Sequence, residues 1–296
     1  MKEDFPAACI AVCTTLVIAA ATASAFAVDS APLNCPFFAF DDAPGFMRLS
    51  SDEQAKMLAE LGYHGIGYTG TRRIPEMLRA LDSHGLKLVS IYTEANLDSA
   101  KPPFDPGLKT AIEQLRGRET FIWLPVMGGT PSSHALDDRA VQIIGAIADM
   151  ADKSGVRVVL YPHTGFYVER TEDAVRLTKK LGRKNVGATF NLCHFLKVDK
   201  EKNLEQRLKE AMPYLMAVSI NGADSGDTQR MKWRGQLIQT LDRGSFDVAQ
   251  VLRVLRHSRY QGPIGLQCYD VQGDPRENFA RSMSAWQKLL ARVNAE

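Results

Sequence analysis

The clearest pattern in the chain is a two-residue alternation that ends in polar side chains. From Val186 to Asn191 every second residue is apolar, and the residues between them are glycine, threonine and asparagine. Alternation of this kind predicts a β-strand. The apolar side suits packing beneath helices, whereas the small, polar side suits the crowded interior of a barrel. His194 follows just beyond the end of the strand.

The same pattern recurs in three other stretches, which begin near residues 156, 216 and 263. Polar side chains stand at or just beyond the C-terminal ends of all four predicted strands. They are Tyr161, His163, Asn191, His194, Ser219, Asn221 and Gln267. Because the C-terminal ends of parallel barrel strands converge, we expect these side chains to line one pocket.

Strands and amphipathic helices alternate along the rest of the chain. Further strands are predicted at 37–40, 64–68, 86–92 and 121–126, and helices at 51–61, 74–83, 108–115, 136–153, 171–181, 204–212, 246–257 and 276–293. Ser51 or Asp52 is expected to cap the first helix. Eight strands alternating with eight helices predict an α/β fold, a single-domain (β/α)8 TIM barrel.

One residue of the third strand and one loop concern a functional site. In the third strand Glu94 shares the parity of Ser90 and Tyr92, which makes Glu94 a candidate pocket carboxylate. A loop of about 20 residues follows the seventh strand, and long loops within compact domains are usually functional. It holds Trp233 among basic residues, so it is either a lid over the pocket or a solvated loop.

The N-terminus has the features of a leader. An apolar run over residues 7–21 precedes Ala25-Phe26-Ala27, a pattern typical of signal peptidase sites. We therefore expect residues 1–27 to be a signal peptide, residues 28–296 to form the barrel, and the protein to be exported to the periplasm or the extracellular space. Lys2 is followed by two acidic residues, which is atypical of a signal peptide and leaves a misassigned start or an uncleaved anchor as alternatives.

Charge and cysteine content narrow the possible partners. The formal net charge is +2, and no long run of Lys or Arg suggests a nucleic-acid surface. A small-molecule partner is expected, with no nucleic acid and no membrane once the leader is cleaved. Cys35, Cys193 and Cys268 remain beyond the leader without CxxC spacing, which predicts buried thiols. A bridge between Cys35 and Cys268, on the neighbouring first and eighth strands, is the alternative.

The C-terminal part of the chain resembles a known family. Gly244-Ser245-Phe246-Asp247, the helix after it, Tyr260, Gly262 and Gly265-Leu266-Gln267 resemble the final unit of the xylose isomerase-like TIM barrels, which include sugar-phosphate isomerases, epimerases and endonuclease IV relatives. The resemblance implies a divalent metal held by Glu, Asp, His and Glu on strands five to eight. Those positions fall on Tyr161, Asn191, Ser219 and Gln267, whereas His194 matches a histidine of the strand-six motif.

These departures remove the negative charges and the imidazole that such a metal requires. Hard cations need carboxylates to offset dehydration, so a conventional Mn or Mg site is not expected. His163 and His194, assisted by amide oxygens, are the remaining ligands for a softer divalent metal. The neutral groups that replace the ligands can donate and accept hydrogen bonds, which suits the hydroxyls of an uncharged carbohydrate.

Three functions are compatible with this pocket. In the first, a sugar isomerase or epimerase, His163, His194 and Glu94 transfer a proton next to a carbonyl. The second is a metal-independent lyase acting on 3-keto-glycosides, with Asn191 or Tyr161 stabilising the oxyanion. The third is a non-catalytic carbohydrate-binding barrel, in which both histidines are simply packed side chains. Repair at abasic DNA sites is disfavoured because the endonuclease IV relatives use a multi-zinc cluster that this sequence has replaced.

Overall fold

The computed structural model describes Met1 and residues 31–296, and the strands of this part form a closed parallel barrel. In order around the barrel they are β1 (Phe37–Phe40), β10 (Ile264–Leu266), β9 (Leu215–Ile220), β8 (Val186–Asn191), β7 (Arg157–Leu160), β5 (Phe121–Leu124), β3 (Lys87–Tyr92) and β2 (Gly65–Thr69). A separate parallel pair joins β4 (Ala95–Asn96) to β6 (Val126–Met127). The predicted (β/α)8 fold is therefore confirmed.

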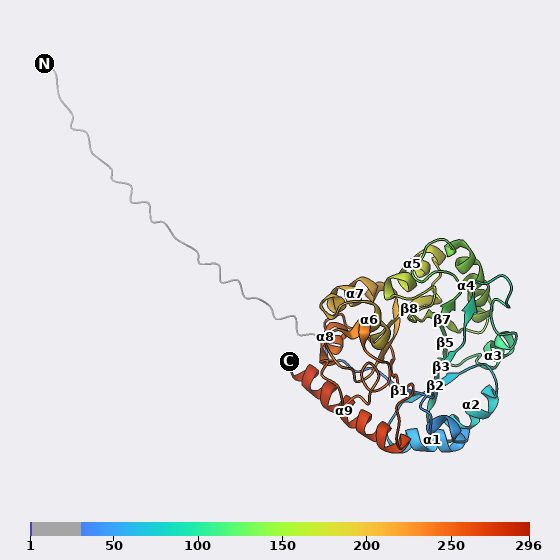
Figure 1. Cartoon of the computed structure of the whole chain (residues 1–296), viewed down its shortest axis with the longest axis horizontal. Coiled ribbons are helices and arrows are strands. Elements are labelled where there is room, and N and C mark those ends of the chain that lie inside the picture. Colours follow the sequence, from blue (N-terminus) through green and yellow to red (C-terminus); the bar gives the residue numbers. More distant parts are fainter. Residues whose placement is uncertain (2–30) are drawn as a thin grey trace.

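Helices surround the barrel, as Figure 1 shows. They are α1 (Ser51–Glu60), α2 (Ile74–Ser83), α3 (Leu108–Gln114), α4 (Asp137–Asp152), α5 (Thr171–Leu181), α6 (Leu192–Val198), α7 (Leu204–Ala211), α8 (Ala249–His257) and α9 (Pro275–Ala295), with 3-10 turns η1 (Phe46–Arg48), η2 (Glu201–Asn203), η3 (Met212–Tyr214) and η4 (Thr228–Arg230). Helix α6, which follows β8 directly, is not predicted from the sequence. None of the helices in the described part is long and apolar enough to cross a bilayer.

The cap of α1 differs from the prediction. Ser50, rather than Ser51 or Asp52, precedes the first helical turn, and its hydroxyl accepts a hydrogen bond from the Glu53 backbone N–H at 3.3 Å. The Glu53 carboxylate accepts the Ser50 backbone N–H at 2.8 Å. This reciprocal capping box satisfies two N–H groups that the helix itself leaves unpaired.

Aromatic side chains fill the interior of the barrel. Phe40 packs against Trp123 with ring centroids 4.7 Å apart, and the Trp123 indole N–H donates to the Thr189 hydroxyl at 2.6 Å. The small, polar side of β8 therefore faces inward, as the alternation predicts. A Cβ on Gly265 would lie 2.6 Å from Phe40 Cε1, so only glycine leaves room for these rings. Above this packed interior, at the C-terminal ends of the strands, is where ligand sites of such barrels lie.

The cysteines of residues 31–296, which are Cys35, Cys193 and Cys268, have buried, free thiols. Cys35 and Cys268 form no disulfide, so the alternative of a bridge is wrong. Their strands are neighbours, but Cys35 precedes β1 whereas Cys268 follows β10, which places the two thiols at opposite ends of the barrel. The predicted signal peptide over residues 1–27 lies, Met1 apart, outside the described residues.

Candidate functional site

A cavity of about 520 Å³ opens at the C-terminal ends of the strands. Its walls come from residues of every strand of the barrel or the loop that follows it. They are Phe40, Asp41, Asp42, Met47, Gly67, Thr69, Ser90, Tyr92, Trp123, Tyr161, His163, Thr164, His194, Lys197, Trp233, Ile238, Gln267 and Tyr269. The cavity thus combines aromatic walls with two carboxyl groups, two imidazoles and several hydroxyls.

The two histidines lie against each other, with ring centroids 4.2 Å apart. Nδ1 of His194 lies 3.1 Å from the Thr164 backbone nitrogen. A backbone N–H can only donate, so Nδ1 is the acceptor and the proton of neutral His194 resides on Nε2. Nδ1 of His163 lies 3.0 Å from the Thr164 carbonyl oxygen, which can only accept, so the proton of His163 resides on Nδ1.

Thr164 therefore sets opposite tautomers on the two rings. Within residues 31–296 Nε2 of neither ring makes a hydrogen bond, and neither is among the polar atoms sealed from solvent. His163 thus offers a lone pair to the cavity and His194 offers an N–H. Burial lowers the pKa of both imidazoles, that of His194 well below its usual value, and this favours the neutral forms.

Tyr161 and Gln267 form the floor of the cavity. The Gln267 side-chain carbonyl accepts the Tyr269 backbone N–H at 2.9 Å, which fixes the orientation of the amide. Its NH2 group then donates to the Tyr161 hydroxyl at 3.2 Å, so the Tyr161 proton is available to a ligand. Burial raises the pKa of Tyr161 well above its usual value and keeps the hydroxyl neutral. Tyr161 is therefore a neutral hydrogen-bond donor at the floor.

Two adjacent carboxyl groups stand at the end of β1. The Asp41 carboxylate accepts the Thr69 hydroxyl at 2.6 Å and the Thr69 backbone N–H at 2.9 Å, which holds it in place. Asp42 accepts the Cys268 thiol proton at 3.2 Å. Burial, and secondarily the nearby Asp41 charge, raise the pKa of Asp42 to about 7. Asp42 can therefore gain or lose a proton near neutral pH.

The structure brings four of the eight predicted site residues into this cavity, namely Tyr161, His163, His194 and Gln267. Glu94 is exposed and lines a separate shallow depression instead, because the chain leaves the barrel wall after Tyr92. The other three residues are buried outside the cavity lining. They are Asn191, Ser219 and Asn221.

Asn221 has a structural contact. Its side-chain NH2 group donates to the carbonyl oxygens of Gly222 and Leu237 at 2.8 and 2.7 Å, which closes the base of the loop over residues 222–245. Asn191 Nδ2 and Ser219 Oγ have no hydrogen-bond partner within the described part of the chain.

Sequence reasoning missed Asp41 and Asp42, although both directly follow a predicted strand, and it missed Lys197 on the unpredicted helix α6.

The groups at the four family ligand positions do not fit a divalent metal. Asn191 and Ser219 do not reach the cavity, the Gln267 side-chain oxygen already accepts the Tyr269 N–H, and Tyr161 is a neutral phenol. Among residues 31–296 no group of three or more His, Cys, Asp or Glu side chains is placed to hold a metal ion. Three or more convergent oxygen or nitrogen ligands are what such ions require.

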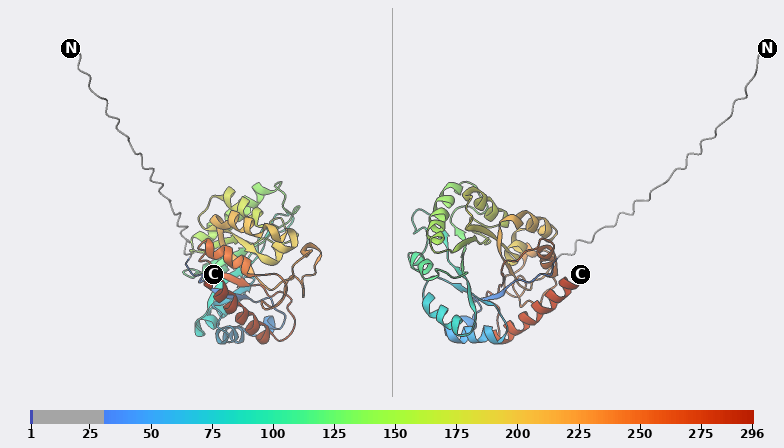
Figure 2. Two further views of the ribbon diagram at one scale, coloured as in Figure 1. Left: turned by 90° about the vertical axis from the view of Figure 1, so that its left-hand side faces the viewer. Right: turned by 180° about the vertical axis from the view of Figure 1, so that it is seen from behind.

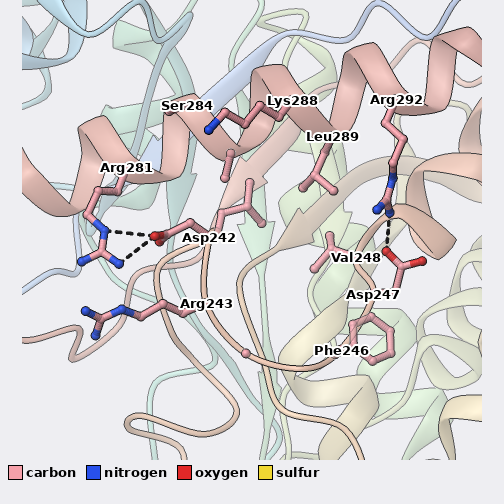
Figure 3. Close-up of a pocket in the computed structure, with 13 residues that line it drawn as sticks. Asp242, Arg243, Phe246, Asp247, Val248, Arg281, Ser284, Lys288, Leu289 and Arg292 are labelled. Atoms are coloured by element: carbon pink, nitrogen blue, oxygen red, sulfur yellow. Dashed lines mark hydrogen bonds and ion pairs between the residues drawn. The ribbon is translucent and has the colours of Figure 1, made fainter.

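A second hollow of about 580 Å³ lies between α9 and the segment that leads into α8 (Figure 3). Its carboxylates are already paired, because Asp242 accepts two N–H groups of Arg281 at 2.7 and 3.0 Å and Asp247 pairs with Arg292. It lies on the helical face rather than where the strands converge. We therefore assign the candidate site to the central cavity.

Comparison with known proteins agrees with the fold. The model of the xylose isomerase-like TIM barrel family matches residues 55–289, whereas no curated protein matches the chain. The apo structure of the 3-keto-D-glucoside 4-epimerase YcjR from E. coli is similar, with a TM-score of 0.67 at 17% identity, covering 86% of this chain and 99% of that one.

Two further structures show the same barrel. D-allulose 3-epimerase from Methylomonas sp. superposes with a TM-score of 0.68 at 14% identity, covering 87% of this chain and 99% of that one. A xylose isomerase-like TIM barrel protein from Mycobacterium smegmatis in complex with magnesium gives 0.61 at 18% identity, with coverages of 88% and 98%. At these identities the similarity establishes the shared fold.

Proposed function

The chain belongs to the xylose isomerase-like TIM barrel family, and we propose that it is a sugar epimerase or isomerase acting by proton transfer next to a carbonyl. The observation that carries the proposal is the pair of opposite histidine tautomers fixed by Thr164. One imidazole offers a base and the other an N–H donor in the same cavity. That is the pair of groups that enolisation of a ketone or aldehyde requires.

In the proposed reaction, the carbonyl oxygen accepts hydrogen bonds from Nε2–H of His194 and from the Tyr161 hydroxyl. These neutral, preorganised donors stabilise the negative charge that develops on the oxygen as the neighbouring C–H bond breaks. Nε2 of His163 takes the proton, and the electron pair of the C–H bond forms the enolate double bond. The low pKa of His163 makes it a modest base, so stabilisation of the oxyanion supplies most of the lowering of the barrier to proton removal.

Asp42 is the proposed partner that returns the proton. In the barrel order β1 lies opposite β7, so Asp42 and His163 approach the cavity from opposite sides. Epimerisation removes a proton from one face of a carbon and returns one to the other face, which this arrangement suits. A carboxyl group whose pKa is about 7 can give a proton and regain it at neutral pH.

Asp42 also supports a second candidate, a metal-independent lyase acting on 3-keto-glycosides. There His163 removes the proton next to the ketone, the electron pair forms a carbon–carbon double bond, and the glycosidic C–O bond breaks. The leaving oxygen then takes the Asp42 proton. Both reactions begin with the same enolisation, so one assay tests their shared step.

That assay is deuterium exchange followed by NMR, with a panel of ketohexoses and methyl 3-keto-glycosides in D2O. We expect wild-type protein to exchange the C–H next to the carbonyl, His163→Ala to lose exchange at least ~100-fold, and His257→Ala, at an exposed position on α8, to be unchanged. Binding without any exchange across the panel would instead favour the non-catalytic carbohydrate-binding barrel.

The proposal includes export. A carbohydrate substrate without phosphate, which the neutral donors and acceptors of the cavity suit, is available outside the cytoplasm. Mass spectrometry of the protein purified from the producing cells tests cleavage, because removal of residues 1–27 leaves a chain that begins at Val28. An intact N-terminus would contradict a cleaved signal peptide.

A further inference from the structure

Exposed apolar side chains gather at the mouth of the central cavity. Apart from Met1, the large hydrophobic side chains that are exposed in the described part of the chain are Met47 and Tyr269, at 55% and 56% exposure. Both line the cavity. A single exposed apolar residue is normal at a protein surface. Two at one opening, beside the partly buried Trp233, are typical of a surface that contacts a ligand.

Trp233 connects this mouth with the chemical groups below it. Its ring lies edge to face with His194, with centroids 5.1 Å apart, and the Lys197 ammonium lies 5.5 Å from the centre of the ring. Lys197 also donates to the Met231 carbonyl oxygen at 2.7 Å, which ties the loop over residues 222–245 to α6. The indole is therefore held in place at the cavity wall.

A second contact ties this loop to the one that follows β10. The Arg234 guanidinium lies 2.6 Å from the Asp270 carboxylate, and these residues are the chain neighbours of Trp233 and Tyr269. An exposed ion pair of this kind adds little stability, but it holds the two loops together at the mouth. The left view of Figure 2 shows the segment between β9 and α8 extending beyond the barrel at one end.

The volume of the cavity exceeds what a single sugar needs. Cavities of about 300–1,000 Å³ enclose drug-sized ligands, which are larger than a monosaccharide. At about 520 Å³ this cavity has room for a sugar at the floor, near Tyr161 and the histidines, and for a second group beneath the mouth.

We infer that Met47, Trp233 and Tyr269, here called the rim platform, form a second subsite for a ring attached to the anomeric oxygen of the sugar. Aromatic faces and a methionine thioether bind flat rings with an apolar face, which an aryl group or a second pyranose presents. The substrate is accordingly a glycoside rather than a free sugar. This inference rests on the proposed function for the sugar at the floor, whereas the platform itself rests on the exposed apolar side chains.

Calorimetric titration without turnover tests the platform. The probes are the methyl and phenyl β-glycosides of glucose, galactose and xylose, with cellobiose as the probe for a second pyranose. For at least one sugar we expect the phenyl glycoside or the disaccharide to bind about tenfold more tightly than the methyl glycoside, the effect of one well-placed ring. Which of the two gains affinity distinguishes an aryl group from a second sugar.

Tyr269→Ala should remove most of this advantage and, because the side chain is exposed, should leave the fold intact. Trp233→Ala should remove it as well, and Tyr214→Ala, at a partly buried tyrosine outside the cavity, should not. The inference would be overturned if the methyl glycoside, the phenyl glycoside and the disaccharide bound with equal affinity, or if none of them bound. It would also be overturned if the tighter binding of the larger probe survived in both Tyr269→Ala and Trp233→Ala.

The outcome is separable from that of the proposed function. Ring-dependent binding without deuterium exchange would refute proton transfer and leave the platform standing. Exchange with equal binding of methyl and phenyl glycosides would refute the platform alone.

Discussion

Replacing Asp42 by Asn isolates the ionisation of the carboxyl group at the end of β1. Asparagine has nearly the same shape, and its side-chain oxygen can still accept the Cys268 thiol proton. It cannot ionise. The native Asp42 pKa of about 7, against 3.8 for an unperturbed aspartate, means that the folded protein retains a proton that the unfolded chain has released. Because the pKa is raised on folding, the contribution of Asp42 to the free energy of unfolding is greatest below pH ~4 and is lost as the pH rises towards 7.

The size of this loss follows from the difference in pKa. Each pKa unit corresponds to about 1.4 kcal/mol, so full burial would make ionised Asp42 cost about 4 kcal/mol, of which about 3 kcal/mol would fall between pH 5 and 8. Asp42 is only partly buried and faces an open cavity, so solvent screening reduces the expected loss over this range to about 1–2 kcal/mol.

Urea unfolding of wild-type and Asp42→Asn protein at pH 5 and pH 8 measures this quantity. Titrating groups that do not interact with Asp42 cancel in the difference between the two proteins. We expect the variant to gain about 1–2 kcal/mol relative to wild type on going from pH 5 to pH 8. Glu113→Gln, at an exposed position on α3, serves as the control and should show no such gain. A stability difference that does not change with pH would refute the raised pKa of Asp42.

Further predictions concern the histidines, the barrel interior and the thiols. Nitrogen-15 NMR at pH 7 should show His163 protonated on Nδ1 and His194 on Nε2, because Thr164 fixes both tautomers; an imidazolium or the reverse assignment would contradict the site. Gly265→Ala should lower the free energy of unfolding by about 1–3 kcal/mol through overpacking against the aromatic interior, and an unchanged urea midpoint would contradict that packing. Reducing agent should leave the melting temperature unchanged, because Cys268 is a free thiol; a drop would indicate a disulfide.

Much of the barrel could be predicted because its signals are local. Helices α2 and α5 begin and end at the predicted residues, because the apolar spacing and the glycine after each helix are features of the local sequence. Helix α6 was missed because Leu192–Val198 is almost entirely buried and shows little amphipathic contrast. Periodicity predicts a helix only when one of its faces is exposed to solvent.

The site was predicted less completely, for geometric reasons. Of the residues selected by strand parity, Tyr161 and Gln267 line the cavity, whereas Asn191, Ser219 and Asn221 are buried outside its lining. Glu94 lies elsewhere because the chain has already left the barrel wall at that residue. Asp41 and Asp42 could have been found by the rule that identified the histidines, since they also follow a strand end. The tautomers could not have been predicted, because they depend on Thr164 lying 3.1 Å from a ring 30 residues away in sequence.

We have proposed that the groups of this cavity enolise a carbohydrate carbonyl compound without a divalent metal ligand set. Deuterium exchange by chelator-treated wild-type protein and His163→Ala on the keto-sugar panel, with and without added Mn²⁺ or Mg²⁺, tests this proposal. We expect the treated wild type to exchange the C–H next to the carbonyl at a rate that added metal does not change, and His163→Ala to exchange it at least ~100-fold more slowly. Exchange that requires the added cation, or that proceeds at the wild-type rate in His163→Ala, would contradict metal-independent enolisation by His163.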